Sequence, residues 1–353
     1  MMPEINMDCE TSGHHLHNRL DLGLSPMDST RTINPACIQS HGGETSLMDS
    51  TRTTNHVGST IDFTTTSDLT SEISSGTANP ESLASYQLHR LLGRGKYSQV
   101  YAATHAQTGM QVAMKKVAIF DMMDPQARVD CLREVKILQS LEHPNIIKCF
   151  NSFIQDNELV IILEWAEAGD LGLALKSRAQ SGALFPQEQV HELFSQICSA
   201  MVHMHNRRMM HRDLKPHNIF IAGDGNLKLG DLGLSRYFSS RTLQAMSTVG
   251  TPCYMSPECI KGHPYEFSSD IWSLGCLLYE LLTLRNPFYK EHQSLYVLGK
   301  NITSCTYEPL PSHVAPHFRD LVTAMLQPCP NSRPTINQIC EVLKQPWGQL
   351  QGR

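Results

Sequence analysis

The sequence His-Arg-Asp-Leu-Lys-Pro-His-Asn occupies residues 211–218, between a long amphipathic stretch at 187–206 and a short apolar one at 219–222. Asp213 can accept or orient the proton of a hydroxyl group, and Lys215 can neutralise a phosphate in transfer. Asn218 offers an oxygen of the kind that binds hard cations. The stretch therefore predicts phosphoryl transfer to a hydroxyl group.

A second acidic motif, Asp231-Leu232-Gly233, follows thirteen residues after Asn218. It comes after the apolar stretches 219–222 and 226–230, which we predict to be short strands. A carboxylate there would complete a magnesium site with Asn218. The two motifs together predict a metal-bound phosphate ligand.

The stretch Gly-Arg-Gly-Lys-Tyr-Ser-Gln-Val at residues 93–100 lies between two predicted strands. Its glycines would let backbone N–H groups approach phosphate oxygens closely, because no Cβ intervenes. Taken alone it favours a plain hairpin turn. It is not a dinucleotide-binding fingerprint, since Ser98 replaces the third glycine and a strand follows instead of a helix. The motifs downstream favour a phosphate-binding loop.

Lys115 belongs to an otherwise apolar predicted strand and is followed by Lys116. Strand side chains alternate between faces, so only one of the two lysines can face a cleft. Lys115 could also be a surface lysine whose stem packs on apolar neighbours. Glu134 lies nineteen residues on, in a predicted helix, and an ion pair with it would fix Lys115 against nucleotide phosphates.

The pattern of apolar residues predicts an α+β protein in two lobes. Alternating stretches at 86–92, 98–104, 110–117, 146–153 and 158–163 predict strands, and helical spacing begins at Pro125. From Asp170 onward the pattern is mainly helical, with amphipathic stretches at 187–206, 268–284 and 316–327. A strand-rich part followed by a helix-rich part predicts two lobes with a ligand cleft between them.

Residues 86 to about 345 resemble a eukaryotic protein kinase domain, because all of these motifs occur in the kinase order. Four stretches are similar to the NIMA-related (never-in-mitosis A-related) kinases, especially the short mitotic members that are nearly all catalytic domain: 117–124, 163–171, 229–234 and 250–258. The resemblance implies the bilobal kinase fold, with a small β-rich N-lobe and a larger helical C-lobe.

The resemblance also implies roles for individual residues. Asp213 would be the catalytic aspartate, Lys215 its partner, and Lys115 and Glu134 the lysine–glutamate pair; Asn218 and Asp231 would bind magnesium, with Mn²⁺ as an alternative. Asp270 would brace the catalytic loop, and Arg333 would pair with Glu258. The ATP-contacting positions that it implies are Leu92, Gly93, Arg94, Gly95, Lys96, Tyr97, Ser98, Gln99, Val100, Ala113, Lys115, Leu163, Glu164, Ala166, Asp170, Asn218 and Asp231.

Substrate class and control are also implied by the resemblance. Lys215 and Thr251 are typical of serine/threonine kinases, and His217 replaces the glutamate of arginine-directed kinases, which predicts no strict arginine requirement upstream of the acceptor. Arg212 next to the catalytic aspartate favours activation by phosphate, on Ser247 first and Thr248 second. The implied setting is the mitotic spindle and cell cycle, in the cytoplasm and also the nucleus and centrosome, downstream of a larger NIMA-related kinase.

Cys149 stands where mitotic members carry an autoinhibitory tyrosine. It lacks the ring and hydroxyl, so one interpretation is weaker autoinhibition of that type. The other is that Cys149 is a small buried hydrophobic residue.

Composition limits the remaining possibilities. The 353 residues are 41 % hydrophobic with a net charge of −5, which disfavours nucleic acid or an anionic membrane as a partner. The resemblance implies protein substrates, and we expect a monomer. The N-terminus lacks the apolar segment of a secretion signal, and eleven scattered cysteines are typical of reduced intracellular thiols. A scaffold pseudokinase would need a broken catalytic motif, and a metabolic nucleotide enzyme would have no use for an activation segment.

The first 80 residues differ from the rest, with ten acids, three arginines, no lysine and 24 Ser or Thr. Such a segment cannot bury enough apolar surface to fold, so we predict a disordered tail over 1–82 and a kinase domain over 83–350, with lobes at about 86–165 and 166–345. Met-Asp-Ser-Thr-Arg-Thr occurs at 27–32 and again at 48–53, either as a docking or phosphorylation element or as a neutral duplication. His14, His15 and His17 are better explained by composition than by metal binding.

Overall fold

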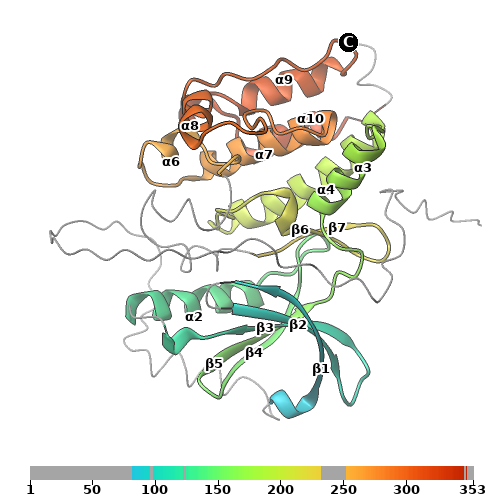
Figure 1. Cartoon of the computed structure of the whole chain (residues 1–353), viewed down its shortest axis with the longest axis vertical. Helices are drawn as coiled ribbons and strands as arrows, with labels where there is room; N and C mark the ends of the chain where they lie inside the picture. Colours follow the sequence, from blue (N-terminus) through green and yellow to red (C-terminus); the bar gives the residue numbers. More distant parts are fainter. Residues whose placement is uncertain (1–81, 96–97, 122–124, 232–251, 346, 348–353) are drawn as a thin grey trace, which may run out of the picture.

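The computed structural model describes residues 82–95, 98–121, 125–231, 252–345 and 347. Apart from Ser82, the predicted tail and its repeat lie outside the described residues, as does the segment 232–251. Figure 1 shows two lobes, a strand-rich one drawn in cyan to green and a helical one drawn in green to red. The predicted α+β bilobal fold is confirmed.

The N-lobe is a five-stranded antiparallel sheet in the order β1-β2-β3-β5-β4. Its strands are β1 Tyr86–Arg94, β2 Ser98–His105, β3 Gln111–Val117, β4 Cys149–Gln155 and β5 Glu158–Glu164. The short 3-10 helix η1 Leu83–Ser85 precedes β1, and η2 Ile119–Asp121 lies between β3 and α2. Antiparallel neighbours need only short turns, and glycine-containing stretches provide them between β1 and β2 and between β2 and β3. The turn between β4 and β5 uses Asp156 and Asn157, both at positive φ.

Helix α2 (Pro125–Gln139) packs on one face of the sheet (Figure 1). Leu132 and Val135 of α2 are buried in the same apolar cluster as Leu159 and Ile161 of β5. The residues between them, such as Val160, belong to a second cluster on the opposite face. The period-2 alternation of a strand therefore gives β5 two buried faces, which explains its unbroken apolar sequence.

The C-lobe is mainly helical and is built around α7, most of whose residues are buried. Its α-helices are α3 Leu171–Ser181, α4 Gln187–Asn206, α6 Pro257–Ile260, α7 Phe267–Thr283, α8 Leu295–Thr303, α9 Pro316–Met325 and α10 Ile336–Leu343. Its other elements are η3 Pro216–Asn218, β6 Ile219–Ile221, β7 Leu227–Leu229 and η5 Pro330–Ser332. The hairpin β6–β7 follows the catalytic loop and brings the chain back to Asp231.

The predicted strand at 146–153 is displaced, since β4 begins only at Cys149. The residues before it pair with the C-lobe instead: Ile146 forms a parallel bridge with Leu229 of β7, and Ile147 N donates to Leu229 O at 2.9 Å. The apolar pattern is the same for either partner, so it could not reveal this link. This segment therefore links the two lobes close to the hinge, the stretch from Glu164 to Ala166 that follows β5.

Candidate active site

Asp270 of α7 holds the catalytic loop through hydrogen bonds to the loop backbone. Its carboxylate accepts hydrogen bonds from the backbone N–H groups of His211 (2.9 Å) and Arg212 (3.0 Å), which confirms the predicted bracing role. Arg212 has a φ of 69°, a left-handed conformation that costs energy in a non-glycine residue. The two bonds offset that cost and fix the loop where it reaches Asp213.

Asp270 is itself held by two residues that motif spacing did not indicate. His205 Nε2 of α4 lies 2.9 Å from Asp270 Oδ2, and the Tyr265 hydroxyl donates to Oδ1 at 2.5 Å. Burial would raise the pKa of Asp270, but the hydrogen bond from His205 and the nearby imidazoles outweigh it and lower the pKa. The carboxylate therefore stays charged at the base of the loop.

Asp213, Lys215 and Asn218 converge on one another, as the sequence predicts. Lys215 Nζ lies 2.8 Å from Asp213 Oδ2. Asn218 Nδ2 donates to the same oxygen at 2.9 Å and to the Asp213 carbonyl at 2.7 Å. These contacts orient the carboxylate and place an ammonium group directly beside it, an arrangement suited to a hydroxyl acceptor and a transferring phosphate.

Lys115 reaches across the cleft to Asp231, with Nζ 2.7 Å from Oδ1. Its positive charge lowers the pKa of Asp231 and outweighs the opposing effect of burial. Lys116 points to the other face of the sheet and pairs with Glu158 at 2.9 Å. The predicted alternation is confirmed, and Lys115 is the lysine of the cleft.

Glu134 lies in the same neighbourhood. Burial and then the negative charge of Glu134 raise the pKa of the Cys131 thiol to about 12, while Lys115 acts on that thiol in the opposite sense. Both charges are thus within electrostatic range of Cys131, one turn before Glu134 on α2. The direct Lys115–Glu134 ion pair stays a prediction.

Strand register gathers several predicted nucleotide-binding residues on one face. Val100 pairs with Lys115, and Ala113 pairs with Leu163. Side chains of directly paired residues lie on the same face of a sheet, and so do those of every second residue along a strand. All four side chains therefore lie on the face of Lys115, the cleft face. Leu92 and the hinge residues Glu164 and Ala166 are partly buried. These positions can together enclose a flat heterocyclic base.

The glycine-rich turn connects β1 to β2. Gly93 pairs with Val100 and Arg94 with Gln99, while Gly95 N donates to Ser98 O at 2.7 Å. A Cβ on Gly95 would lie 2.8 Å from Ser98 Oγ, so this position requires glycine unless the serine moves. Lys96 and Tyr97 lie outside the described residues.

The donor groups of the site fit Mg²⁺. Asp231 supplies a carboxylate, and Asn218 supplies its amide oxygen, since its Nδ2 donates to Asp213. Among the described residues no group of three or more His, Cys, Asp or Glu could hold a metal ion. Mg²⁺ is typically held by one or two protein ligands together with substrate phosphates, and the Asp231 carboxylate and Asn218 amide oxygen are groups of that kind.

Asp170 and His217 meet at the mouth of the site. His217 Nδ1 lies 3.0 Å from Asp170 Oδ1, which also caps α3 by accepting from Leu173 N. The hydrogen bond to Asp170 raises the pKa of His217. A Cβ on Gly172 would lie within 2.4 Å of the imidazole, so this glycine lets the ring pack against α3.

Comparison with known proteins identifies this arrangement. The family model described as protein kinase domain matches residues 86–347. The chain belongs to the protein kinase family. This kinase chain is 39 % identical over 73 % of its length to a probable serine/threonine-protein kinase nek3 of Dictyostelium discoideum, and 37 % over 71 % to serine/threonine-protein kinase Nek1 of Mus musculus. It is 35 % identical over 74 % of its length to Nek5 of Homo sapiens.

These relatives confirm the predicted resemblance to NIMA-related kinases. The kinase chain spans 23 % of the Dictyostelium relative, 20 % of Nek1 and 36 % of Nek5, so it covers about a fifth to a third of their lengths. The matched residues include every described element from β1 to α10. The comparison therefore concerns the kinase domain.

Two regulatory predictions have different outcomes in the structure of this kinase. Ser247, Thr248 and Thr251 lie outside the described residues. Cys149 is buried at the start of β4, its Sγ lies 3.6 Å from Asn151 O, and burial raises its pKa to about 12. A neutral buried thiol agrees with its interpretation as a small hydrophobic residue.

Proposed function

We propose that the protein transfers the γ-phosphate of ATP to serine or threonine hydroxyls of protein substrates. The observation that carries this proposal is the 2.7 Å contact of Lys115 with Asp231 across the cleft. It joins the N-lobe lysine to the acidic group that follows the catalytic loop.

Each side chain has a definite part in the proposed reaction. Asp213 accepts or orients the proton of the substrate hydroxyl as its oxygen bonds to the γ-phosphorus and the bond to the β-phosphate oxygen breaks. Lys215 neutralises charge on the transferring group, and Lys115 holds the α- and β-phosphates. Mg²⁺ held by Asp231 and Asn218 would supply charge neutralisation of the triphosphate. Catalysis is then mainly positioning and electrostatic stabilisation.

Transfer of radiolabel from ATP to casein tests this function. We expect label in casein with the unmutated protein and a loss of at least about a hundredfold with Asp231→Ala, because Asp231 anchors both Lys115 and the metal site. ATP binding without transfer by the unmutated protein would favour a scaffold pseudokinase and contradict the proposal.

The substrate preference is proposed to favour an apolar residue upstream of the acceptor. His217 is paired with Asp170, which places an imidazole beside a carboxylate that would otherwise be available to an arginine. A peptide library should therefore show no dominant selection for arginine at the nearer upstream positions. Dominant arginine selection there would contradict this proposal.

Activation is proposed to require phosphate on Ser247. Arg212 has its backbone fixed by Asp270 and carries a permanent charge next to Asp213, so an added phosphate has a cationic partner. Ser247→Ala should lower kcat sharply, with Thr248→Ala as the matched control. Unchanged turnover in Ser247→Ala would move the proposed site to Thr248. A larger NIMA-related kinase upstream and a role at the spindle, in cytoplasm, nucleus and centrosome, rest on resemblance alone.

A further inference from the structure

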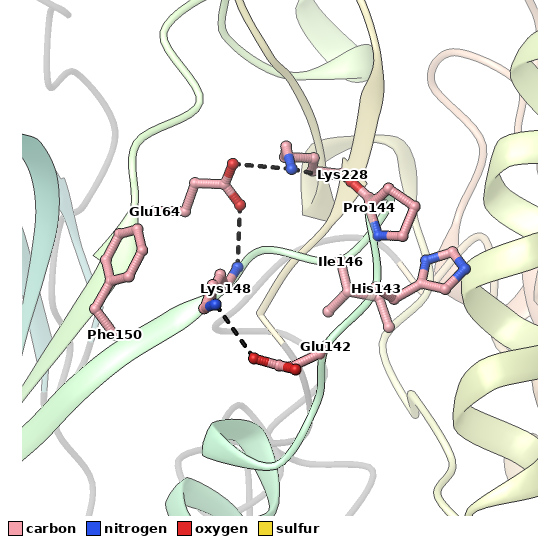
Figure 2. A pocket seen from close by; sticks show the side chains of 8 residues that line it. All are labelled: Glu142, His143, Pro144, Ile146, Lys148, Phe150, Glu164 and Lys228. Carbon is pink, nitrogen blue, oxygen red and sulfur yellow. Dashed lines mark hydrogen bonds and ion pairs between the residues drawn. The ribbon is translucent and has the colours of Figure 1, made fainter.

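A polar network lies behind the hinge, on a pocket of about 380 Å³ (Figure 2). Glu164, the last residue of β5, is at its centre. Its Oε1 lies 2.8 Å from Lys228 Nζ, and its Oε2 accepts from Lys148 N at 3.1 Å. Lys228 Nζ also donates to the Pro144 carbonyl at 2.9 Å. In addition, Glu164 N donates to Lys148 O at 2.8 Å. Glu164 and Lys228 thus take part in four hydrogen bonds or ion pairs of this network.

This network connects the two lobes through the hinge. Lys228 lies on β7 of the C-lobe, whereas Pro144 and Lys148 lie in the segment 140–148 that joins α2 to β4 of the N-lobe. The Lys228 side chain is 15 % exposed and that of Glu164 is 26 % exposed, so solvent screens this pair less than an ordinary surface pair. It therefore holds the hinge to both lobes at once.

We infer that Lys228 is a positioning residue for the nucleotide, acting through the side chain of Glu164. This inference rests on the proposed function and on the kinase resemblance, which implies that Glu164 contacts ATP through its backbone. By strand alternation the Glu164 side chain lies on the face of β5 opposite that of Leu163. Figure 2 shows it in the pocket, where Lys228 and the Lys148 amide hold it. Because the Glu164 side chain is anchored in this pocket, the backbone of Glu164 is held in place as well.

The arrangement of the cleft predicts whether loss of the network weakens or strengthens nucleotide binding. The lobe orientation that closes the Lys228–Glu164 contact also brings Lys115 within 2.7 Å of Asp231. The network thus stabilises an orientation in which the phosphate-binding groups are assembled. Its loss should weaken nucleotide binding and leave the chemical step nearly intact.

The same pocket contains a matched control. Lys148 Nζ pairs with Glu142 at 3.2 Å, but their side chains are 52 % and 78 % exposed and both belong to the N-lobe side of the hinge. This pair has the same residue types and lines the same pocket. It does not reach the C-lobe, so its removal should leave nucleotide binding unchanged.

A double-mutant cycle on the full chain tests the inference. Lys228→Met and Glu164→Gln should each raise the KM for ATP by about five-fold with kcat within about two-fold, and the double variant should be no worse than either single variant. Lys228→Arg should keep the KM for ATP of the unmutated protein. The control variant with both Lys148→Met and Glu142→Gln should keep it as well. The Kd for ATP with Mg²⁺, from thermal shift, gives a second readout that does not depend on turnover.

Three results would overturn the inference: an unchanged KM and Kd in Lys228→Met, additive effects in the double variant, or a raised kcat with unchanged KM. The last would mean that the network restrains lobe movement instead of positioning the nucleotide. If the unmutated protein binds ATP but transfers no phosphate, the proposed function fails while the Kd values still test the role of Lys228. Melting curves of each variant establish that it is folded.

Discussion

At the scale of single residues, the best-defined ion pair of the C-lobe joins Arg333 to Glu258. Arg333 Nη1 and Nη2 each lie 2.8 Å from one carboxylate oxygen, and the Ser269 hydroxyl donates to Oε1 at 2.7 Å. The guanidinium also lies 5.0 Å from the centre of the Trp272 ring. Burial would raise the pKa of Glu258, but the bonds from Arg333 and Ser269 lower it to about 2. Such a planar two-bond pair confirms the predicted link between the end of the activation segment and the C-lobe.

Removing one partner of this pair should be costly. Arg333→Met leaves Glu258, which is 8 % exposed, without its cation and should lower the free energy of unfolding by about 3–5 kcal/mol at pH 7. Urea unfolding followed by circular dichroism measures it. The control is Lys344→Met, which removes the fully exposed pair with Glu341 and should have no measurable effect. Equal stability of both variants would contradict the expectation.

The same variant has a predicted pH dependence. The folded pKa of Glu258, about 2, lies below its ordinary value of 4.5, so the pair stabilises fully above that value and loses its contribution as the pH falls toward 2. The difference in unfolding free energy between the unmutated protein and Arg333→Met should therefore be constant from pH 7 to about 5. It should then narrow as the pH falls further. A difference that widened in acid would show that another group controls it.

At the scale of elements, the contact of α7 with α9 depends on a glycine. A Cβ on Gly275 would lie 2.9 Å from both the Cβ of Met325 and the Cδ2 of Leu326. The leucine methyl could rotate away, but the Met325 Cβ moves only with its backbone. Close approach of the two helices therefore requires glycine, although glycine inside a helix costs about 1 kcal/mol relative to alanine.

Two glycine-to-alanine variants should change stability in opposite directions. Gly275→Ala should destabilise the protein by about 1–2 kcal/mol, because the overpacking at α9 exceeds the gain in helix propensity. Gly299→Ala in α8 places its Cβ no closer than 3.9 Å to Ile260 Cγ2, so it should stabilise by about 0.5–1 kcal/mol. Thermal unfolding of the two variants measures both effects. A stabilised Gly275→Ala would show that the helices can separate at little cost.

At the scale of the whole molecule, the site exists only where the lobes meet. Lys115 comes from the N-lobe sheet, while Asp231 follows the C-lobe hairpin β6–β7. Neither lobe contains a complete set of phosphate-binding groups. A ligand that contacts both should therefore stabilise the folded molecule as a unit.

ATP with Mg²⁺ should raise the melting temperature of the protein. At a ligand concentration one hundred times Kd the gain is about 2.7 kcal/mol, or about 5–10 °C for a domain of this size. Lys115→Met should lose most of that shift, and removal of Mg²⁺ with EDTA should reduce it in the unmutated protein. An equal shift in Lys115→Met would exclude Lys115 from the binding site. No described helix is both long and apolar enough to span a membrane.

Much of the site could be predicted because its motifs are local. Residues 211–218 form one loop, so Asp213, Lys215 and Asn218 lie together in any fold that holds that loop in this shape. The opposite faces of Lys115 and Lys116 follow from strand alternation alone. Similarly, the predicted helix at 187–206 coincides with α4, since its apolar residues recur at helical spacing along its whole length.

The sequence by itself determined the order of strands and helices, the catalytic loop and the lysine that faces the cleft, because periodicity and motif spacing act over a few residues. Only the tertiary structure decided which distant groups meet. Lys115 and Asp231 are 116 positions apart, and His205 and Asp270 are 65 apart. Lys228 likewise reaches Glu164 only because 145–148 pairs with β7. No local pattern encodes such contacts, since they arise when the packing of separate elements, within the C-lobe or between the lobes, brings distant residues together.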